Sequence, residues 1–218
     1  MSTLTTVEST TGRASNSSPG KRGVGGYNDG MDDLLAAALA QMTVLDETGT
    51  ATSLGRFWVN RPVVLAFVRH LGCIFCRQQV AGLSKRVPEI EGRGGLLVVV
   101  APAKPEHIAG FRASTSYRGA LFVDPALRAF RTAGLVRGRA STYHPLALLR
   151  GIGAMAQGHR QVGRHGDIVQ QGGTFVLGPG DRVRYEWRDR YAGHHPNLDE
   201  VVKALPEKNP LPSGERAG

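Results

Sequence analysis

The sequence predicts an α/β fold in which helices flank a mixed central sheet. Two apolar runs, at residues 62–68 and 96–102, have the length and β-branched composition of strands buried on both faces of a sheet. Apolar residues at helical spacing follow the first run, and a helix-forming segment follows the second. This alternation of strand and helix is typical of a parallel or mixed sheet with helices on its faces.

The chain before the first buried strand predicts a tail, a helix and a hairpin. Residues 1–28 are rich in Ser, Thr and Gly and lack hydrophobic periodicity, so we expect a disordered tail. Residues 31–41 begin with acidic side chains and continue in good helix formers, which predicts a short helix. Residues 43–54 hold a Glu-Thr-Gly turn between β-prone stretches and predict an N-terminal hairpin.

The middle of the chain predicts helices and a further strand. We expect one helix from residue 73 to about residue 90, and a second over 104–111. Residues 119–123 are typical of a short strand. Asp124 then has the chemistry of an N-cap for a helix over 125–132, with a proline as its first helical residue.

Residues 29–206 predict a single domain that carries one insertion. The insertion, at 137–171, is rich in Gly, Arg and His and contains an apolar segment that predicts a helix within a loop. Residues 174–188 form two β-prone runs around a Gly-Pro-Gly-Asp turn and predict a hairpin. We expect a last helix over 196–205 and a flexible tail over 207–218.

The cysteine content and the hydropathy pattern restrict the class of protein. The 218 residues include only two cysteines, three positions apart, which argues against a secreted domain held by disulfides. The N-terminus lacks the apolar core of a secretory signal, and no run of 18 apolar residues predicts a membrane span. We therefore expect a cytoplasmic protein that does not associate with membranes.

The chain is basic, with a net charge of +9. Its arginines are scattered among glycines and form no dense block, so we expect a basic solvated surface and no nucleic-acid binding. Attraction of anionic substrates or partners is the main alternative, and weak nucleic-acid association would show a steep dependence on salt.

The two cysteines form a Cys-x-x-Cys motif where a buried strand turns into a helix. Free N–H groups at the helix start stabilise a thiolate, and Arg69 and Arg77 add positive charge close by. His70 is either a proton shuttle or a polar residue of an exposed turn. We expect Cys73 to be the more exposed thiol, with a lowered pKa, and to attack the substrate. Cys76, one turn later on the same face, would resolve the adduct.

The motif and two further blocks resemble a known family. Residues 63–83, VVLAFVRHLGCIFCRQQVAGL, are similar to the active-site strand and helix of the peroxiredoxin-like (AhpC/TSA-type) group that includes selenoprotein U relatives and prostamide/prostaglandin F synthase. Residues 170–195 resemble its Gly-Gly-x-Phe-Val hairpin and the polar stretch after it, and residues 45–54 its N-terminal hairpin. The hallmark run of that group is matched by Phe67, Arg69, Gly72, Cys73, Cys76 and Arg77.

The resemblance implies a thioredoxin-like fold and thiol-dependent reduction of a peroxide, an endoperoxide or a disulfide. It also implies that no cofactor is bound and that electrons come from NADPH through a thioredoxin-like or low-molecular-weight thiol reductant. A homodimer is possible on the same ground. Gly72, Gly172, Gly173 and Thr174 would form the substrate groove beside the dithiol.

The sequence departs from the related families at several positions. Laid onto typical peroxiredoxins, it places their peroxidatic cysteine at Cys76, their threonine at Cys73 and their proline at Arg69. Their later arginine falls on Gly172, and the cis-proline of thioredoxins falls on Gly173. The groups that polarise a peroxide bond in typical peroxiredoxins are therefore missing from those positions, and Arg69 or Arg77 would have to replace them.

Other uses of the dithiol stay open on the sequence alone. Cys73 and Cys76 could be half of a zinc site completed by His159 and His165, could bridge a metal cluster between two chains, or could be idle in a binding protein. We expect no metal, because a dithiol between a strand and a helix already has a redox explanation. The pair of histidines at 194–195 could line a site, but it is more typical of a loop before a helix. The substrate, the electron donor and the oligomeric state are not fixed.

Overall fold

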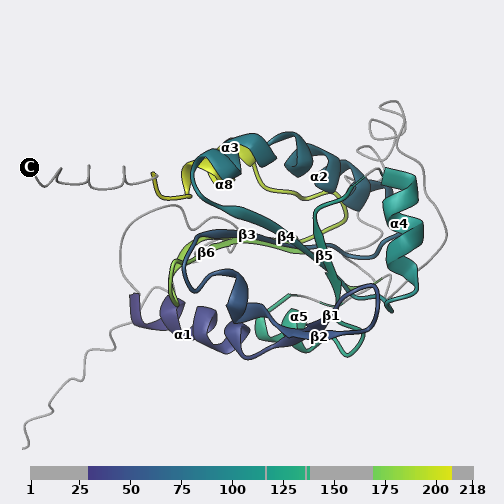
Figure 1. Cartoon of the computed structure of the whole chain (residues 1–218), viewed down its shortest axis with the longest axis horizontal. Coiled ribbons are helices and arrows are strands. Elements are labelled where there is room, and N and C mark those ends of the chain that lie inside the picture. The colour runs from purple at the N-terminus through teal and green to yellow at the C-terminus, as the bar shows by residue number, and fades with distance from the viewer. Residues whose placement is uncertain (1–28, 116, 136, 138–168, 208–218) are drawn as a thin grey trace, which may run out of the picture.

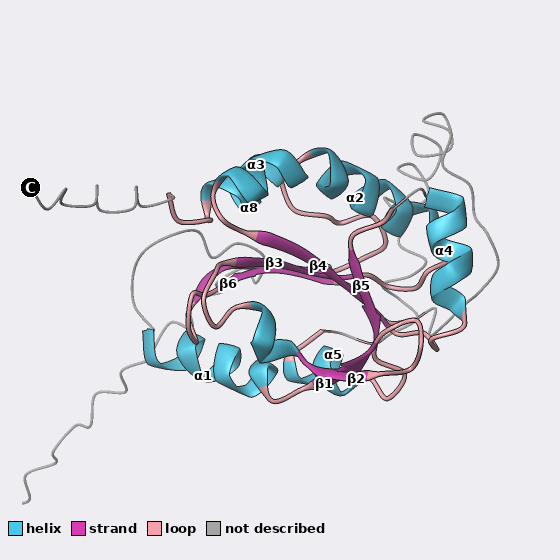
Figure 2. Cartoon of the chain, in the orientation of Figure 1, coloured by secondary structure: helices cyan, strands magenta, loops and turns pink. Residues whose placement is uncertain are grey.

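A computed structural model describes residues 29–115, 117–135, 137 and 169–207 of the chain. Across these residues one seven-stranded mixed sheet has the strand order β2-β1-β5-β4-β3-β6-β7. Helices cover both of its faces, as Figures 1 and 2 show. The predicted α/β class with a mixed central sheet is therefore confirmed. The predicted N-terminal tail, the helix inside the insertion and most of the C-terminal tail lie outside the described residues.

The two apolar runs form the centre of the sheet, as predicted. β3 (Val63–Phe67) and β4 (Leu96–Ala101) pair in parallel, and every residue of β3 is buried. β5 (Ala120–Val123), the third predicted strand, pairs in parallel with β4. Since parallel strands need helical crossovers, the chain between them must return over the faces of the sheet.

The N-terminal segment adds the predicted helix and hairpin. α1 (Asp29–Ala40) precedes strands β1 (Thr43–Leu45) and β2 (Ala51–Ser53), which pair with each other antiparallel. The turn between them is fixed by Asp46, whose Oδ1 accepts hydrogen bonds from two backbone N–H groups. A short 3-10 helix, η1 (Leu54–Phe57), leads toward the central strands.

The C-terminal segment closes the other edge of the sheet. β6 (Gly173–Leu177) pairs antiparallel with β3, and β7 (Val183–Arg188) pairs antiparallel with β6. α8 (Leu198–Lys203) follows, and the side chain of its N-cap, Asn197, accepts a hydrogen bond from the backbone N–H of Asp199. The hairpin and the last helix were both predicted.

Two helices differ from the prediction. The helix expected from residue 73 to about 90 is two helices, α2 (Ile74–Lys85) and α3 (Val87–Gly92), because Pro88 in the first turn of α3 cannot continue a helix from before it.

The predicted helix over 125–132 is shorter, since α5 (Arg128–Thr132) begins after Leu127, which has a left-handed backbone with φ 57°. Asp124 still accepts a hydrogen bond from a backbone N–H of this helix, that of Ala129, at 2.8 Å. The helix expected over 104–111 lies slightly later, as α4 (His107–Thr115).

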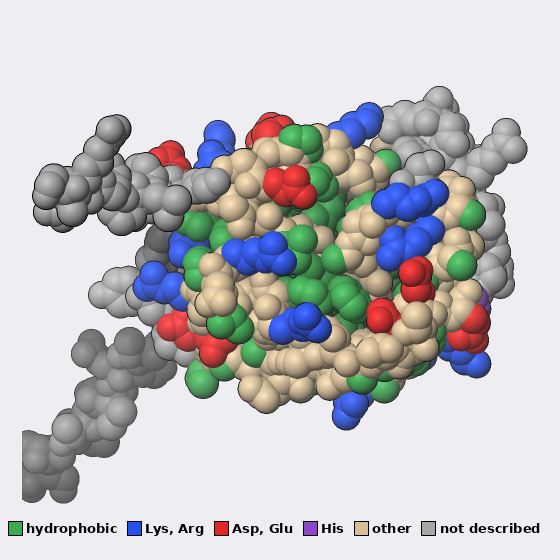
Figure 3. All heavy atoms as spheres, in the orientation of Figure 1, with side chains coloured by type: hydrophobic (Ala, Val, Ile, Leu, Met, Phe, Trp, Pro, Cys, Tyr) green, Lys and Arg blue, Asp and Glu red, His purple; other side chains and the backbone are tan. Residues whose placement is uncertain are grey.

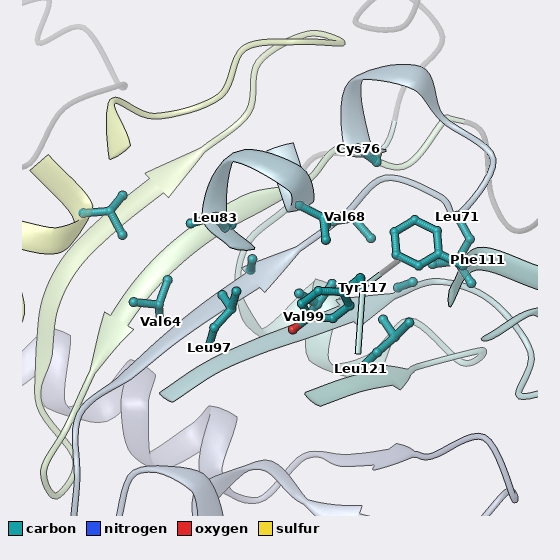
Figure 4. Close-up of a cluster of buried hydrophobic side chains, with 14 of the residues drawn as sticks. Val64, Val68, Leu71, Cys76, Leu83, Leu97, Val99, Phe111, Tyr117 and Leu121 are labelled. Carbon is teal, nitrogen blue, oxygen red and sulfur yellow. The ribbon is translucent and has the colours of Figure 1, made fainter. Parts of the chain in front are cut away.

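The sheet separates two hydrophobic clusters. One lies between the sheet and α2, α3, α4 and α8, and it contains both cysteines (Figure 4). The other lies between the sheet and α1 and α5, and is centred on Phe67, Phe130 and Phe175. The dithiol therefore belongs to one face of the sheet and is separated by the sheet from the second core.

On the face shown in Figure 3, basic side chains are separated by acidic and uncharged surface. Among the described residues, no helix has the length and apolar character that a membrane crossing needs.

Candidate active site

The dithiol stands at the junction between β3 and α2. The chain leaves β3 after Phe67 and turns at His70, whose carbonyl accepts a hydrogen bond from the backbone N–H of Cys73 at 3.1 Å. Cys73 is the N-cap of α2, with extended backbone angles, and its carbonyl accepts the helical N–H of Arg77. The sulfur of Cys73 therefore lies at the start of a helix of 12 residues, where N–H groups and the helix dipole favour a negative charge.

The surroundings of the two thiols shift their pKa values in opposite directions. A hydrogen bond from Cys76 holds the pKa of Cys73 well below its ordinary value, and His70 and Arg69 lower it further, although burial opposes them. Burial raises the pKa of Cys76 well above its ordinary value, and the neighbouring Cys73 raises it again. Cys73 is therefore the thiol of the pair that ionises more easily, and Cys76 is the one that donates the hydrogen bond.

Both thiols of the pair are buried. The relative exposure of Cys73 is 3%, and that of Cys76 is 0%. Cys73 is the more exposed thiol of the two, as predicted, but it is buried as well, because it packs in the cluster formed by the helices on this face of the sheet. The burial is not purely apolar, however, since Arg69 and His70 are buried beside it.

Each of the two predicted arginines is held in place by a different part of the fold. Arg69 directs Nη1 to the sulfur of Cys73 at 3.8 Å, and its Nε donates to the backbone carbonyl of Gln170 at 3.2 Å. Arg77 donates from Nη2 to the hydroxyl of Ser114 on α4, at 2.7 Å. Burial lowers the pKa of Arg77, and the charge of Cys73 opposes this. Both cations are therefore fixed within the shell around the dithiol.

The residues predicted to form a substrate groove are packed inside the protein. Gly72, Gly172 and Gly173 are buried, and Thr174 is fully buried, with its hydroxyl accepting a hydrogen bond from Gln79 of α2 at 3.2 Å. The side chain of Thr174 therefore does not line an open groove, contrary to the prediction.

The two strand glycines are explained by close packing. A Cβ on Gly172 would collide with the carbonyl of Phe67, and one on Gly173 would lie 2.7 Å from the side chain of Leu135. Neither position has room for the arginine or the cis-proline that the related families place there.

A buried acid and a partly buried histidine near this site were not among the predicted site residues. The side chain of Asp189, just after β7, is 0% exposed, and its Oδ2 lies 3.4 Å from Nδ1 of His195. In the sequence, Asp189 has an arginine on each side, and the simplest interpretation of such an acid is a solvated surface residue. The only available signal was its alternation with Tyr185 and Trp187, which places all three on one face of the strand.

The described residues contain no group of three or more His, Cys, Asp or Glu side chains that could hold a metal ion. His159 and His165, the candidate zinc ligands, lie outside the described residues. Cys73 and Cys76 are both free thiols in this structure.

Comparison with known proteins assigns the family. Residues 82–191 match the model of the AhpC/TSA antioxidant enzyme family. The dithiol lies just before the matched segment, so this match does not by itself assign roles to the two cysteines.

Longer matches to individual proteins extend over most of the chain. The chain is 31% identical to the thioredoxin-like protein AAED1, chloroplastic, of Arabidopsis thaliana, over 78% of this chain and 72% of that protein. It is 31% identical to human peroxiredoxin-like 2C, over 78% and 80% of the two chains. Identity to the prostamide/prostaglandin F synthase of Salmo salar is 28%, over 78% and 86%.

Solved structures support the fold. Peroxiredoxin Q of Xanthomonas campestris superposes with a TM-score of 0.56 at 21% identity, covering 78% of this chain and 92% of that one. Peroxidoxin BcpB of Mycobacterium tuberculosis gives a TM-score of 0.55 at 17% identity, covering 77% and 91%. These likenesses establish a thioredoxin-like fold, and the sequence matches establish the family. The chain belongs to the AhpC/TSA antioxidant enzyme family, within the group of peroxiredoxin-like 2C, AAED1 and prostamide/prostaglandin F synthase.

Proposed function

We propose that this protein is a thiol oxidoreductase that reduces a peroxide, an endoperoxide or a disulfide through Cys73 and Cys76. The observation that carries the proposal is the position of Cys73 at the start of α2, with Cys76 in the first turn of that helix and Nη1 of Arg69 3.8 Å from the Cys73 sulfur. The same surroundings lower the pKa of Cys73 and raise that of Cys76, which favours Cys73 as the nucleophile. The nucleophile in such chemistry is the thiolate and not the thiol.

The first step is attack by the Cys73 thiolate on the oxidised substrate. With a peroxide, the sulfur takes one oxygen as a sulfenic acid, the O–O bond breaks and the second oxygen leaves as an alcohol or water after taking a proton. With an endoperoxide, the O–O bond also breaks, but the sulfur stays joined to the substrate as a sulfenate ester, and the second oxygen takes a proton to become a hydroxyl of the same molecule. With a disulfide, the sulfur forms a mixed disulfide and one thiolate leaves. Nη1 of Arg69 lies 3.8 Å from the sulfur, where it would stabilise the negative charge of the attacking thiolate and of the leaving oxygen or sulfur.

The second step is attack by Cys76 on the Cys73 adduct, which forms the intramolecular disulfide and releases water from a sulfenic acid, the diol from a sulfenate ester or the second thiol from a mixed disulfide. Cysteines in a Cys-x-x-Cys pair at the start of a helix are close enough to bond, and here they already share a hydrogen bond. The reduced dithiol is then restored by an external thiol.

The names of the relatives suggest the substrate class. One relative is named for peroxiredoxins and another for prostamide and prostaglandin F synthesis. We propose the O–O bond of a peroxide or endoperoxide as the first target to test, ahead of disulfides. We also propose a thioredoxin-like or low-molecular-weight thiol as reductant, with electrons from NADPH, no bound cofactor and a cytoplasmic site of action.

The test is stopped-flow oxidation of the reduced protein, followed by intrinsic Trp fluorescence. Hydrogen peroxide, cumene hydroperoxide, a stable bicyclic endoperoxide and glutathione disulfide form the substrate panel. We expect Cys73→Ser to abolish the reaction, and Cys76→Ser to stop it at a sulfenic acid or mixed disulfide visible by mass spectrometry. A protein whose dithiol stays reduced with the whole panel would be a binding protein with an idle dithiol, and the proposal would be wrong.

A further inference from the structure

The mechanism above leaves without a role a buried carboxylate and the partly buried imidazole beside it. Asp189 is 2% exposed, and its carboxylate meets the imidazole of His195 at 3.4 Å. Within the described residues, neither carboxylate oxygen and neither ring nitrogen makes a hydrogen bond. Burying such groups without full hydrogen bonding costs free energy, so their presence calls for an explanation.

The pair lies on the same face of the sheet as the dithiol. Tyr185 and Trp187 of β7 pack in the cluster that contains both cysteines, and Asp189 continues their alternation. Arg188 points to the opposite face, where its guanidinium lies over the ring of Phe175 at 5.4 Å. The Asp189 carboxylate is therefore on the α2 side.

The packing of α2 on the sheet places Cys76 near the end of β6 that adjoins Gly172. Gln79 of α2 donates to Thr174 of β6, which fixes one point of contact between helix and strand. Cys76 is three residues earlier in α2, about 4.5 Å back along the helix. Gly172 is two residues before Thr174, about 6.6 Å along the strand toward the same end of the sheet. Cys76 thus lies at the level of Gly172.

Asp189 is in contact with Gly172. The backbone N–H of Asp189 donates to the carbonyl of Gly172 at 3.0 Å, and a Cβ on Gly172 would be 3.0 Å from Oδ2 of Asp189. The missing side chain therefore leaves the space that the carboxylate occupies. This gives a physical reason for a glycine at this position that is separate from its contact with Phe67.

The loop that carries His195 packs along α2. At its start, a Cβ on Gly193 would be 3.0 Å from the ring of Phe75, the residue before Cys76. At its end, Leu198 touches the position of Gly82, two turns further along the helix. His195 lies between these two contacts and turns toward Asp189. The loop that carries His195 therefore runs beside the first turns of α2.

We infer that Asp189 and His195 form a buried proton relay for Cys76, accepting its proton when its sulfur attacks the Cys73 adduct. The inference rests on the proposed function. His195 takes the proton, and Asp189 stabilises the resulting imidazolium. The Cys76 sulfur forms the S–S bond, the S–O bond of the sulfenic acid breaks, and the departing hydroxide receives the proton as water. With a mixed disulfide, the departing thiolate receives it.

The need for such a relay follows from the chemistry of the second step. Cys76 is fully buried and protonated, whereas the attacking group must be a thiolate. His70 is engaged with Cys73 and supports its negative charge, so it is not free to act as the base for Cys76. Other titratable or charged groups on the elements around the pair are Arg69, Arg77, Arg188, Arg190, Tyr185 and Glu200.

The experiment separates the two steps in time. Reduced protein is mixed with a peroxide that the panel has identified, and the sulfenic acid and the disulfide are followed as two fluorescence phases. We expect Asp189→Asn and His195→Gln to leave the first phase unchanged and to slow the second by roughly 10- to 100-fold near pH 7, in the range of general-base effects. The control variant His107→Gln, which changes a histidine of α4, should alter neither phase.

The pH profile distinguishes a relay from a structural role. The deficit of both variants should shrink as the pH rises, because Cys76 then loses its proton to solvent, whereas a merely displaced helix would slow the step equally at every pH. A second phase that is unchanged, or slowed to the same extent at all pH values, overturns the relay. A change confined to the first phase also overturns it.

Two further observations keep the test decisive. If either variant fails to fold, the unsubstituted protein should still show a solvent deuterium isotope effect on the second phase, and the absence of that effect overturns the relay. If the unsubstituted protein shows no first phase with any substrate, the proposed function itself fails, and the relay fails with it.

Discussion

At the scale of single residues, the chemistry depends on a thiolate that is stable although it is buried. Burial alone raises the pKa of a thiol, as it does for Cys76. At Cys73 the donated hydrogen bond and the nearby cations outweigh that effect. The sequence predicted the helix start and the cations correctly. It could not predict the burial, because Phe111 and Tyr117, which join the same cluster, come from far along the chain.

The balance at Cys73 gives a prediction about its reactivity. Because the folded protein lowers the pKa of Cys73, the thiolate persists below pH about 8.5, the ordinary value for a free cysteine, and is lost only as the pH falls through the lowered value. Iodoacetamide should therefore modify Cys73 of the Cys76→Ser variant with a half-point below that pH.

The variant Cys76→Ala is the matched comparison. It removes the hydrogen-bond donor that contributes most to the lowered pKa, whereas a serine hydroxyl can still donate. The half-point of alkylation should therefore lie at a higher pH in Cys76→Ala than in Cys76→Ser. Equal half-points would show that the contact between the two side chains does not control the thiolate.

At the scale of helices and strands, the elements that were predicted well are those whose signal is local. β3 and β4 are apolar runs bounded by turn residues, and any buried strand needs that pattern. The break between α2 and α3 was missed although Pro88 was visible, since the apolar spacing continues across it. Arg86 at that break bonds to Glu89 and to Asp199 of α8, and the second contact links segments far apart in the chain.

Two helical glycines give opposite predictions for the stability of the fold. A Cβ added to Gly110, inside α4, would have no neighbour within 4 Å, so Gly110→Ala should raise the free energy of unfolding by about 0.5–1 kcal/mol. A Cβ added to Gly55, in η1, would lie 2.7 Å from that of Ala40 in α1, so Gly55→Ala should lower it by about 1–3 kcal/mol.

Urea denaturation of both variants measures these changes as shifts of the midpoint at constant slope. A stabilising Gly55→Ala would mean that α1 does not pack on η1 as described. A destabilising Gly110→Ala would mean that α4 has a neighbour on that side.

At the scale of the whole molecule, the sheet separates the hydrophobic cluster that contains the dithiol from a second cluster that contains no site residue. The site combines α2, the loop after β3, the entry to β6 and the loop after β7, and all of them meet on one face. The Cys-x-x-Cys motif and its place before a helix predicted the dithiol and the arginines near it. The motif did not predict the contact between Asp189 and His195, because that contact depends on strand register and on a loop that returns along α2. The second core lies on the other face of the sheet.

This division predicts that the two cores respond differently to substitution. Phe130 packs edge-on against Phe67 at 5.0 Å in the core remote from the dithiol. Phe130→Leu should therefore lower the free energy of unfolding by about 1–2 kcal/mol through lost packing and a lost aromatic pair. The half-point of Cys73 alkylation should not move, since the sheet lies between the two sites.

Val80, one turn after Cys76 and in the same cluster, provides the comparison. Val80→Ala should cost a similar amount of stability and also speed the alkylation of Cys73, because it loosens the packing that covers the thiol. Both variants are measured by urea denaturation and by the pH profile of alkylation. If Phe130→Leu moved that profile as far as Val80→Ala does, the sheet would be transmitting changes in packing from one face to the other, and the electrostatics of the dithiol would depend on the whole molecule.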